Sequence, residues 1–122
     1  MNIKINIGTL TFDAELHDTP TGEMVFDVLP LNTSFDTWGD EIYFSIPVAA
    51  ELDETASEEV FMGDLGYWPT GKAFCIFFGP TPMSTLGKIV PASAVNVIGK
   101  VHGDALRLKE VMHETQVMVE KA

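Results

Sequence analysis

The run Ala73-Phe74-Cys75-Ile76-Phe77-Phe78 is apolar throughout and is enclosed by residues that break regular structure. Glycines and prolines divide the surrounding residues 63–82 into tight turns. A short aromatic run between such breakers is typical of a β-strand that is buried on both faces. Cys75 is the one cysteine of the chain, and we expect it to be a buried, inert thiol, because it has no disulfide partner and only Lys72 provides nearby positive charge.

Further strands are predicted on both sides of this run. Residues 1–16 alternate apolar and polar side chains with one phase change at Gly8-Thr9, which predicts a hairpin. Residues 42–46, 95–101 and 115–120 also alternate and predict three more strands. Gly99 interrupts one of them and indicates a bulge or a close backbone approach. At least six strands are therefore expected.

Two short helices complete the predicted elements. Thr19-Pro20 combines a capping side chain with a proline at the first helical position, and apolar residues then follow at helical spacing until Pro30. Asp104 is the expected cap of a second helix, which runs to Met112. Strands and helices do not alternate regularly, so the sequence favours an antiparallel or mixed barrel whose openings are covered by the helices.

Length and charge limit the function classes. The 122 residues correspond to a single domain over residues 1–122, and the hydrophobic content of 46% indicates a folded core. The formal net charge of −11 opposes binding to nucleic-acid phosphates and to anionic lipid. Neither a signal-peptide pattern nor an apolar run of the ~20 residues of a membrane helix is found. We therefore expect a cytoplasmic protein without nucleic-acid or membrane partners.

The sequence contains no recognisable catalytic or metal-binding motif. The three histidines are far apart, and residues 51–59 carry five carboxylates without the spacing and turn glycine of a calcium loop. We interpret this acidic segment as a solvated loop. A serine nucleophile elbow and a phosphate-binding glycine loop are also missing. We accordingly expect no catalytic residue, no metal and no cofactor.

The most unusual local feature is the placement of the aromatic side chains. Both tryptophans and both tyrosines lie next to turn glycines, in residues 38–44 and 66–71. Side chains at such positions are often only half covered. The rings can line a groove for an extended peptide or an apolar ligand, or they can cap the core of the barrel.

Four segments together resemble a cyclophilin-like family of small prokaryotic proteins of unknown function. These segments are Trp38-Gly39-Asp40-Glu41-Ile42-Tyr43-Phe44, Gly63-Asp64-Leu65-Gly66-Tyr67-Trp68-Pro69-Thr70-Gly71-Lys72-Ala73, Phe77-Phe78-Gly79-Pro80-Thr81-Pro82 and Asn96-Val97-Ile98-Gly99-Lys100-Val101. The resemblance extends over nearly the whole chain. It implies a mainly β fold, a closed or nearly closed barrel of about eight strands with a short helix at each end.

The chain is also distantly similar to the cyclophilins that act as prolyl isomerases. Gly63-Asp64-Leu65, Phe77-Phe78, Thr81-Pro82 and Ile98-Gly99-Lys100-Val101 stand at positions of isomerase motifs. The isomerases polarise the prolyl amide with an arginine from a Phe-His-Arg motif, whereas residues 24–35 contain no arginine. The resemblance thus implies the groove of an isomerase without its catalytic arginine.

We therefore predict a non-catalytic module that binds a peptide or a small apolar ligand. The predicted groove lies between residues 38–44 and 67–83; its lining consists of Trp38, Tyr43, Trp68, Phe77, Thr81 and Met83, with Glu41 as the polar contact. One alternative is a weak prolyl isomerase in which a lysine replaces the arginine. Another is a self-associating protein that forms a homodimer through the apolar loop of residues 79–83.

Overall fold

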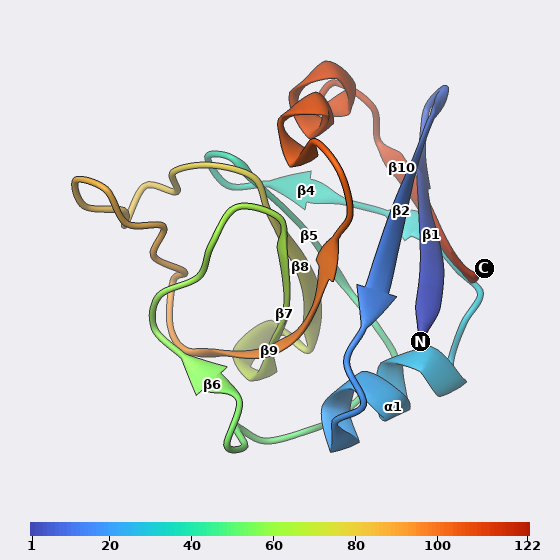
Figure 1. The fold of residues 1–122 in the computed structure, drawn as a ribbon, viewed down its shortest axis with the longest axis horizontal. Coiled ribbons are helices and arrows are strands. Elements are labelled where there is room, and N and C mark those ends of the chain that lie inside the picture. The colour runs from blue at the N-terminus through green and yellow to red at the C-terminus, as the bar shows by residue number, and fades with distance from the viewer.

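The computed structural model describes all residues 1–122 and is mainly β (Figure 1). Most of its elements are strands, and its helices are short, with eight residues in α1 and seven in η2. The elements in chain order are β1 (Asn2–Ile7), β2 (Leu10–Leu16), α1 (Pro20–Asp27), β3 (Leu31–Ser34), β4 (Asp36–Thr37), β5 (Glu41–Ser45), β6 (Ala56–Ser57), β7 (Asp64–Trp68), the 3-10 helix η1 (Pro69–Gly71), β8 (Ala73–Phe77), β9 (Val95–Val101), the 3-10 helix η2 (Ala105–Val111) and β10 (Gln116–Lys121).

The strands form a nearly closed antiparallel barrel. Nine of them follow the order β3-β10-β1-β2-β9-β7-β8-β5-β4, and β6 pairs with β9 outside this path. The two ends of the path, β3 and β4, are consecutive in the chain with only Phe35 between them. Residues 31–37 therefore pair with β10 on one side and β5 on the other, which joins the ends of the sheet. With β3 and β4 taken as one stretch the path has eight strands, which confirms the expected barrel.

Short helices lie at opposite ends of the barrel, α1 at one and η2 at the other (Figure 1). Thr19 caps α1 as predicted, because its hydroxyl oxygen accepts a hydrogen bond from the Gly22 N–H at 3.1 Å. The second helix is a 3-10 helix, and it buries Ala105, Leu108 and Val111 at a spacing of three residues, the period of that helix type. None of the helices has the length and apolar character needed to cross a membrane.

Strand β8 is buried on both faces, as predicted, because it separates two apolar clusters. Phe74 and Ile76 point into the barrel and belong to a core of 25 buried residues. Cys75 and Phe77 point outward and pack with Val95 and other residues in a second cluster of five buried residues. Val60, Ile89 and Val95 pack on this outer face, and the backbones of Val60 and Ile89 meet in an isolated bridge.

Two glycines allow the strands of this region to pack closely. Gly66 lies in β7, which occupies residues that we expected to form turns; a Cβ there would come within 3.0 Å of Val95 and 3.2 Å of Phe77. Gly99 of β9 makes the close backbone approach predicted for it, since a Cβ would lie 2.0 Å from the Glu15 carbonyl oxygen. Glycine at position 66 thus marks a packed strand and not a turn.

The acidic segment 51–59 has no buried residue, as expected of a solvated loop, and it is also fastened to the barrel. The fully buried Asn96 accepts a hydrogen bond from the Asp53 N–H at 2.9 Å. Its amide group donates to the Glu51 carbonyl oxygen at 2.9 Å and to the Thr21 hydroxyl at 3.2 Å. One buried side chain of β9 therefore holds both the acidic segment and the start of α1.

Candidate ligand-binding site

A cavity of about 230 Å³ opens on the outer face of the barrel, beside the second apolar cluster. We call it the aromatic groove. Strand β5 contributes two side chains because alternate residues of a strand share a face. The other lining residues come from the position after β4, from the end of β7, from the loop between β8 and β9, and from the start of β9. The lining residues are Trp38, Glu41, Tyr43, Trp68, Pro91, Ala92 and Val95.

The structure brings together four of the seven predicted site residues, namely Trp38, Glu41, Tyr43 and Trp68. Their three rings are half-buried, as the turn glycines beside them indicated. The other tyrosine, Tyr67, is fully buried in the barrel core, where its hydroxyl donates to the Val48 carbonyl oxygen at 2.6 Å. Of the two tryptophans and two tyrosines, three thus line the groove, and Tyr67 belongs to the core.

The remaining predicted residues lie outside this lining. Phe77 is wholly buried in the second cluster. Thr81 is also buried; its hydroxyl donates to the Val90 carbonyl oxygen, so it holds the β8–β9 loop together. Met83 is 54% exposed on the same loop. Sequence reasoning missed the loop residues that do line the groove, because a long connection has no periodic pattern from which its contacts could be read.

Glu41 is the acidic group of the groove, and its environment is unusual for a carboxyl group. Its residue is only 6% exposed, and no lysine, arginine or histidine forms an ion pair with it. Burial raises the pKa of Glu41 from 4.5 to about 7, and a hydrogen bond with the Cys75 thiol opposes this rise only in part. The carboxyl group can therefore exchange a proton near neutral pH.

Cys75 lies behind Glu41 on β8 and is buried, as predicted. Burial raises the pKa of its thiol well above the ordinary range, and the charge of Glu41 adds to this effect. Since thiolate is the reactive form of cysteine, this thiol is chemically inert in the folded protein.

Hydrogen bonds hold the walls of the groove in place. The Trp68 indole N–H donates to the Ser93 hydroxyl at 2.7 Å, which ties the ring to the β8–β9 loop. The backbone N–H of Trp38 donates to the backbone carbonyl oxygen of Glu41 at 2.9 Å. The Asp40 N–H donates to the Pro80 carbonyl oxygen, also at 2.9 Å. These bonds tie the residues after β4 and the end of β7 to the β8–β9 loop.

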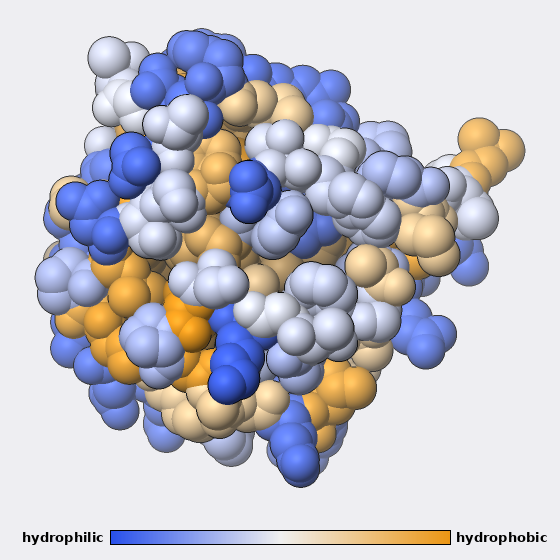
Figure 2. Space-filling model, turned by 180° about the vertical axis from the view of Figure 1, so that it is seen from behind, coloured by the Kyte–Doolittle hydropathy of each residue, from blue (hydrophilic) through white to orange (hydrophobic).

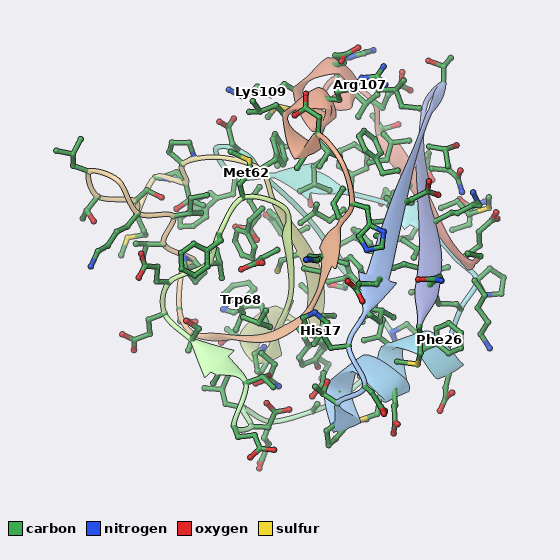
Figure 3. The ribbon with its side chains drawn as sticks, viewed as in Figure 1. His17, Phe26, Met62, Trp68, Arg107 and Lys109 are labelled. Atoms are coloured by element: carbon green, nitrogen blue, oxygen red, sulfur yellow. The ribbon has the colours of Figure 1, made fainter.

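No basic side chain lines the groove. Arg107, the only arginine of the chain, belongs to η2 and pairs with Glu110 at 3.1 Å. Figure 3 shows Arg107 and Lys109 beside η2, at the end of the barrel away from Trp68. The groove therefore offers aromatic faces and a carboxyl group but no cationic donor.

Comparisons with known proteins agree with this architecture. A family model described as Cyclophilin-like matches residues 1–120. The solution structure of the hypothetical protein AF2241 from Archaeoglobus fulgidus is similar over 100% of this chain and 95% of that one, with 42% identity and a TM-score of 0.82. The structure of McbB in complex with tryptophan has a TM-score of 0.74 at 16% identity, and the match covers 98% of this chain and 44% of McbB. That second likeness concerns the fold alone. Among curated proteins, no sequence matches significantly.

Proposed function

The chain belongs to the cyclophilin-like family, and from this premise we propose that it is a non-catalytic binding module. The ligand is a peptide or a small apolar molecule, and it enters the aromatic groove. The observation that carries this proposal is the set of three half-buried rings, those of Trp38, Tyr43 and Trp68, around one cavity. Partly exposed aromatic rings in a pocket are the usual anchors of a binding site.

The size of the groove restricts what it can hold. Pockets for drug-sized molecules measure roughly 300–1,000 Å³. The aromatic groove, at about 230 Å³, is smaller and suits one side chain or one head group. A bound peptide would therefore insert a single residue and leave its neighbours against the β8–β9 loop.

The absence of a cationic donor supports binding without catalysis. Prolyl isomerisation must lower a barrier of about 18–20 kcal/mol, and a donor that weakens the amide resonance is the obvious means. Glu41 only accepts hydrogen bonds when it is ionised, and its protonated form offers a single O–H in place of the five N–H donors of a guanidinium.

The test combines a binding titration with an isomerisation assay on the same set of X-Pro peptides and small apolar compounds. NMR shifts of the backbone amides report binding, and the matched variants are Trp68→Ala in the groove and Phe61→Ala on the surface, where Phe61 is 68% exposed. We expect binding without turnover, lost in Trp68→Ala and kept in Phe61→Ala. Turnover would contradict the non-catalytic role. Undiminished affinity in both Trp38→Ala and Trp68→Ala would contradict the location.

Self-association is a second candidate function, favoured by apolar side chains on the β8–β9 loop. Leu86 is completely exposed and Met83 is 54% exposed. Figure 2 shows an apolar tip that projects from the molecule where this loop extends from the barrel. If this loop pairs two copies, sedimentation should show a dimer whose population grows with concentration, and Leu86→Ser should abolish it. A monomer at every concentration would exclude this role.

A further inference from the structure

The aromatic groove combines three ring faces with one carboxyl group and contains no positive charge. An aromatic face carries negative electrostatic potential, so it attracts a cation that lies over the ring, and tryptophan does so most strongly. Two of the three rings, Trp38 and Trp68, are tryptophans. The rings and the carboxylate therefore favour the same kind of ligand group, one that is positively charged and has an apolar surface.

Anionic and neutral ligands fit this groove less well. An anion would approach the Glu41 carboxylate without any lysine, arginine or histidine in the lining to offset the repulsion, and Lys109 is already paired with the carboxylate of the neighbouring Asp40 at 3.4 Å. A neutral apolar ligand would cover the carboxylate and remove its remaining water, and burial of a charge without a partner is costly. A cation relieves that cost because it brings the missing countercharge into the groove.

The polar groups of the lining distinguish among cations. A primary ammonium group has three N–H donors and is strongly hydrated, so it needs several acceptors when it leaves water. The lining side chains provide such acceptors only at Glu41 and at the Tyr43 hydroxyl. A methylated ammonium group has fewer donors or none, and its methyl groups can contact the rings.

We propose that the aromatic groove binds a methylated ammonium group, with the Glu41 carboxylate as its countercharge and the rings of Trp38, Tyr43 and Trp68 as its walls. This inference rests on the proposed function and names the chemical class of the ligand. The formal net charge of −11 supports it, because an acidic protein concentrates cations at its surface.

Binding of such a cation is coupled to the protonation of Glu41. The titratable groups around this carboxyl group are the Cys75 thiol on β8 and the Tyr43 hydroxyl on β5, while Trp38, Trp68 and Pro91 on the other sides do not titrate. The adjacent Asp40 is paired with Lys109 of η2 at 3.4 Å. Burial raises the pKa of Glu41 to about 7, and a bound cation would lower it. Affinity should therefore increase as the pH rises through 7 and the carboxyl group loses its proton.

The experiment compares choline with two matched probes, followed by tryptophan fluorescence and by NMR shifts. The first probe is 3,3-dimethyl-1-butanol, which replaces the trimethylammonium group of choline by a neutral group of the same shape. The second is ethanolamine, which keeps the charge without the methyl groups. At about pH 8 we expect choline to bind at least about tenfold more tightly than either probe. A peptide with trimethyl-lysine, tested beside choline, shows whether a small quaternary ammonium compound or a modified side chain is the better source of the group.

Variants and pH separate this inference from the proposed function. Glu41→Gln should lower the affinity for choline toward that for the neutral probe, leaving only the preference that comes from the ring faces, and should remove its pH dependence, whereas the exposed Glu58→Gln should change neither. Equal affinity for choline and 3,3-dimethyl-1-butanol would overturn the inference and leave the groove as a binding site for apolar ligands. If X-Pro peptides bind and none of the ammonium compounds does, the inference alone fails. If no compound or peptide shifts the signals of the groove, both proposals fail.

Discussion

Replacement of Glu41 by glutamine should change the pH dependence of the free energy of unfolding. In the unfolded chain this carboxyl group has its ordinary pKa of 4.5, whereas burial in the fold raises the pKa to about 7. Between these values the folded protein keeps a proton that the unfolded chain has released, so a rise in pH favours unfolding. Glutamine resembles the protonated acid and has no proton to lose.

The expected magnitude follows from the two pKa values, 4.5 and about 7. Each pH unit between them costs about 1.4 kcal/mol of stability, so the full loss is about 3 kcal/mol. The stability that Glu41 contributes is thus complete below pH 4.5 and is lost by about pH 7. This is a large part of the ~5–15 kcal/mol that stabilises a typical domain.

Urea unfolding at a series of pH values, followed by circular dichroism, measures this effect. The other titrating groups are shared by the two proteins and cancel in their difference. Glu41→Gln should therefore gain up to about 3 kcal/mol over the wild type as the pH rises. Glu58→Gln, at an exposed position, should follow the wild type throughout. Parallel curves for Glu41→Gln and the wild type would refute the assignment of Glu41 as a buried carboxyl group without a countercharge.

Three further predictions concern the fold around the groove. Gly99→Ala should lower the free energy of unfolding by more than ~3 kcal/mol, because the alanine Cβ would lie 2.0 Å from the Glu15 carbonyl oxygen in the neighbouring strand. A stability close to that of the wild type in urea unfolding would contradict this prediction. Asn96→Leu should lower the free energy of unfolding by ~2–4 kcal/mol, because it removes three hydrogen bonds and leaves buried partners unsatisfied. Thermal or urea unfolding measures this loss, and an unchanged melting temperature would show that Asn96 does not hold the acidic segment. Cys75 is 1% exposed and burial raises the pKa of its thiol, so a thiol reagent should label it only when the protein unfolds; fast labelling under native conditions would disprove its burial.

Several elements could be predicted from local sequence alone. The β1–β2 hairpin follows from strict alternation with a turn at Gly8, and the start of α1 follows from Thr19 and Pro20. Strand β8 was predicted with both faces buried, because every residue from 73 to 78 is apolar. In each case the physical cause lies in residues that are neighbours in the chain.

Other elements depended on contacts that a local pattern does not contain. Strands β3 and β4 are short and largely polar, and they close the barrel only because β10 and β5 provide partners on either side. Strand β7 contains Gly66, which in isolation is typical of a turn; here it permits close packing against Val95 and Phe77. The attachment of the solvated segment 51–59 depends on Asn96, which comes from a distant part of the chain.

For the candidate site, the sequence by itself determined which residue types were available. These are aromatic rings beside glycines and one carboxyl group near them, with no arginine in residues 24–35. Only the tertiary structure decided which of these share a cavity. It placed Glu41 among Trp38, Tyr43 and Trp68, and it directed Phe77 into the apolar cluster behind them. The reason is that β5 and β7 are held on either side of β8 by their pairing with it, and the start of β9 is held beside β7 by its pairing with that strand, and no local pattern in the sequence specifies these pairings.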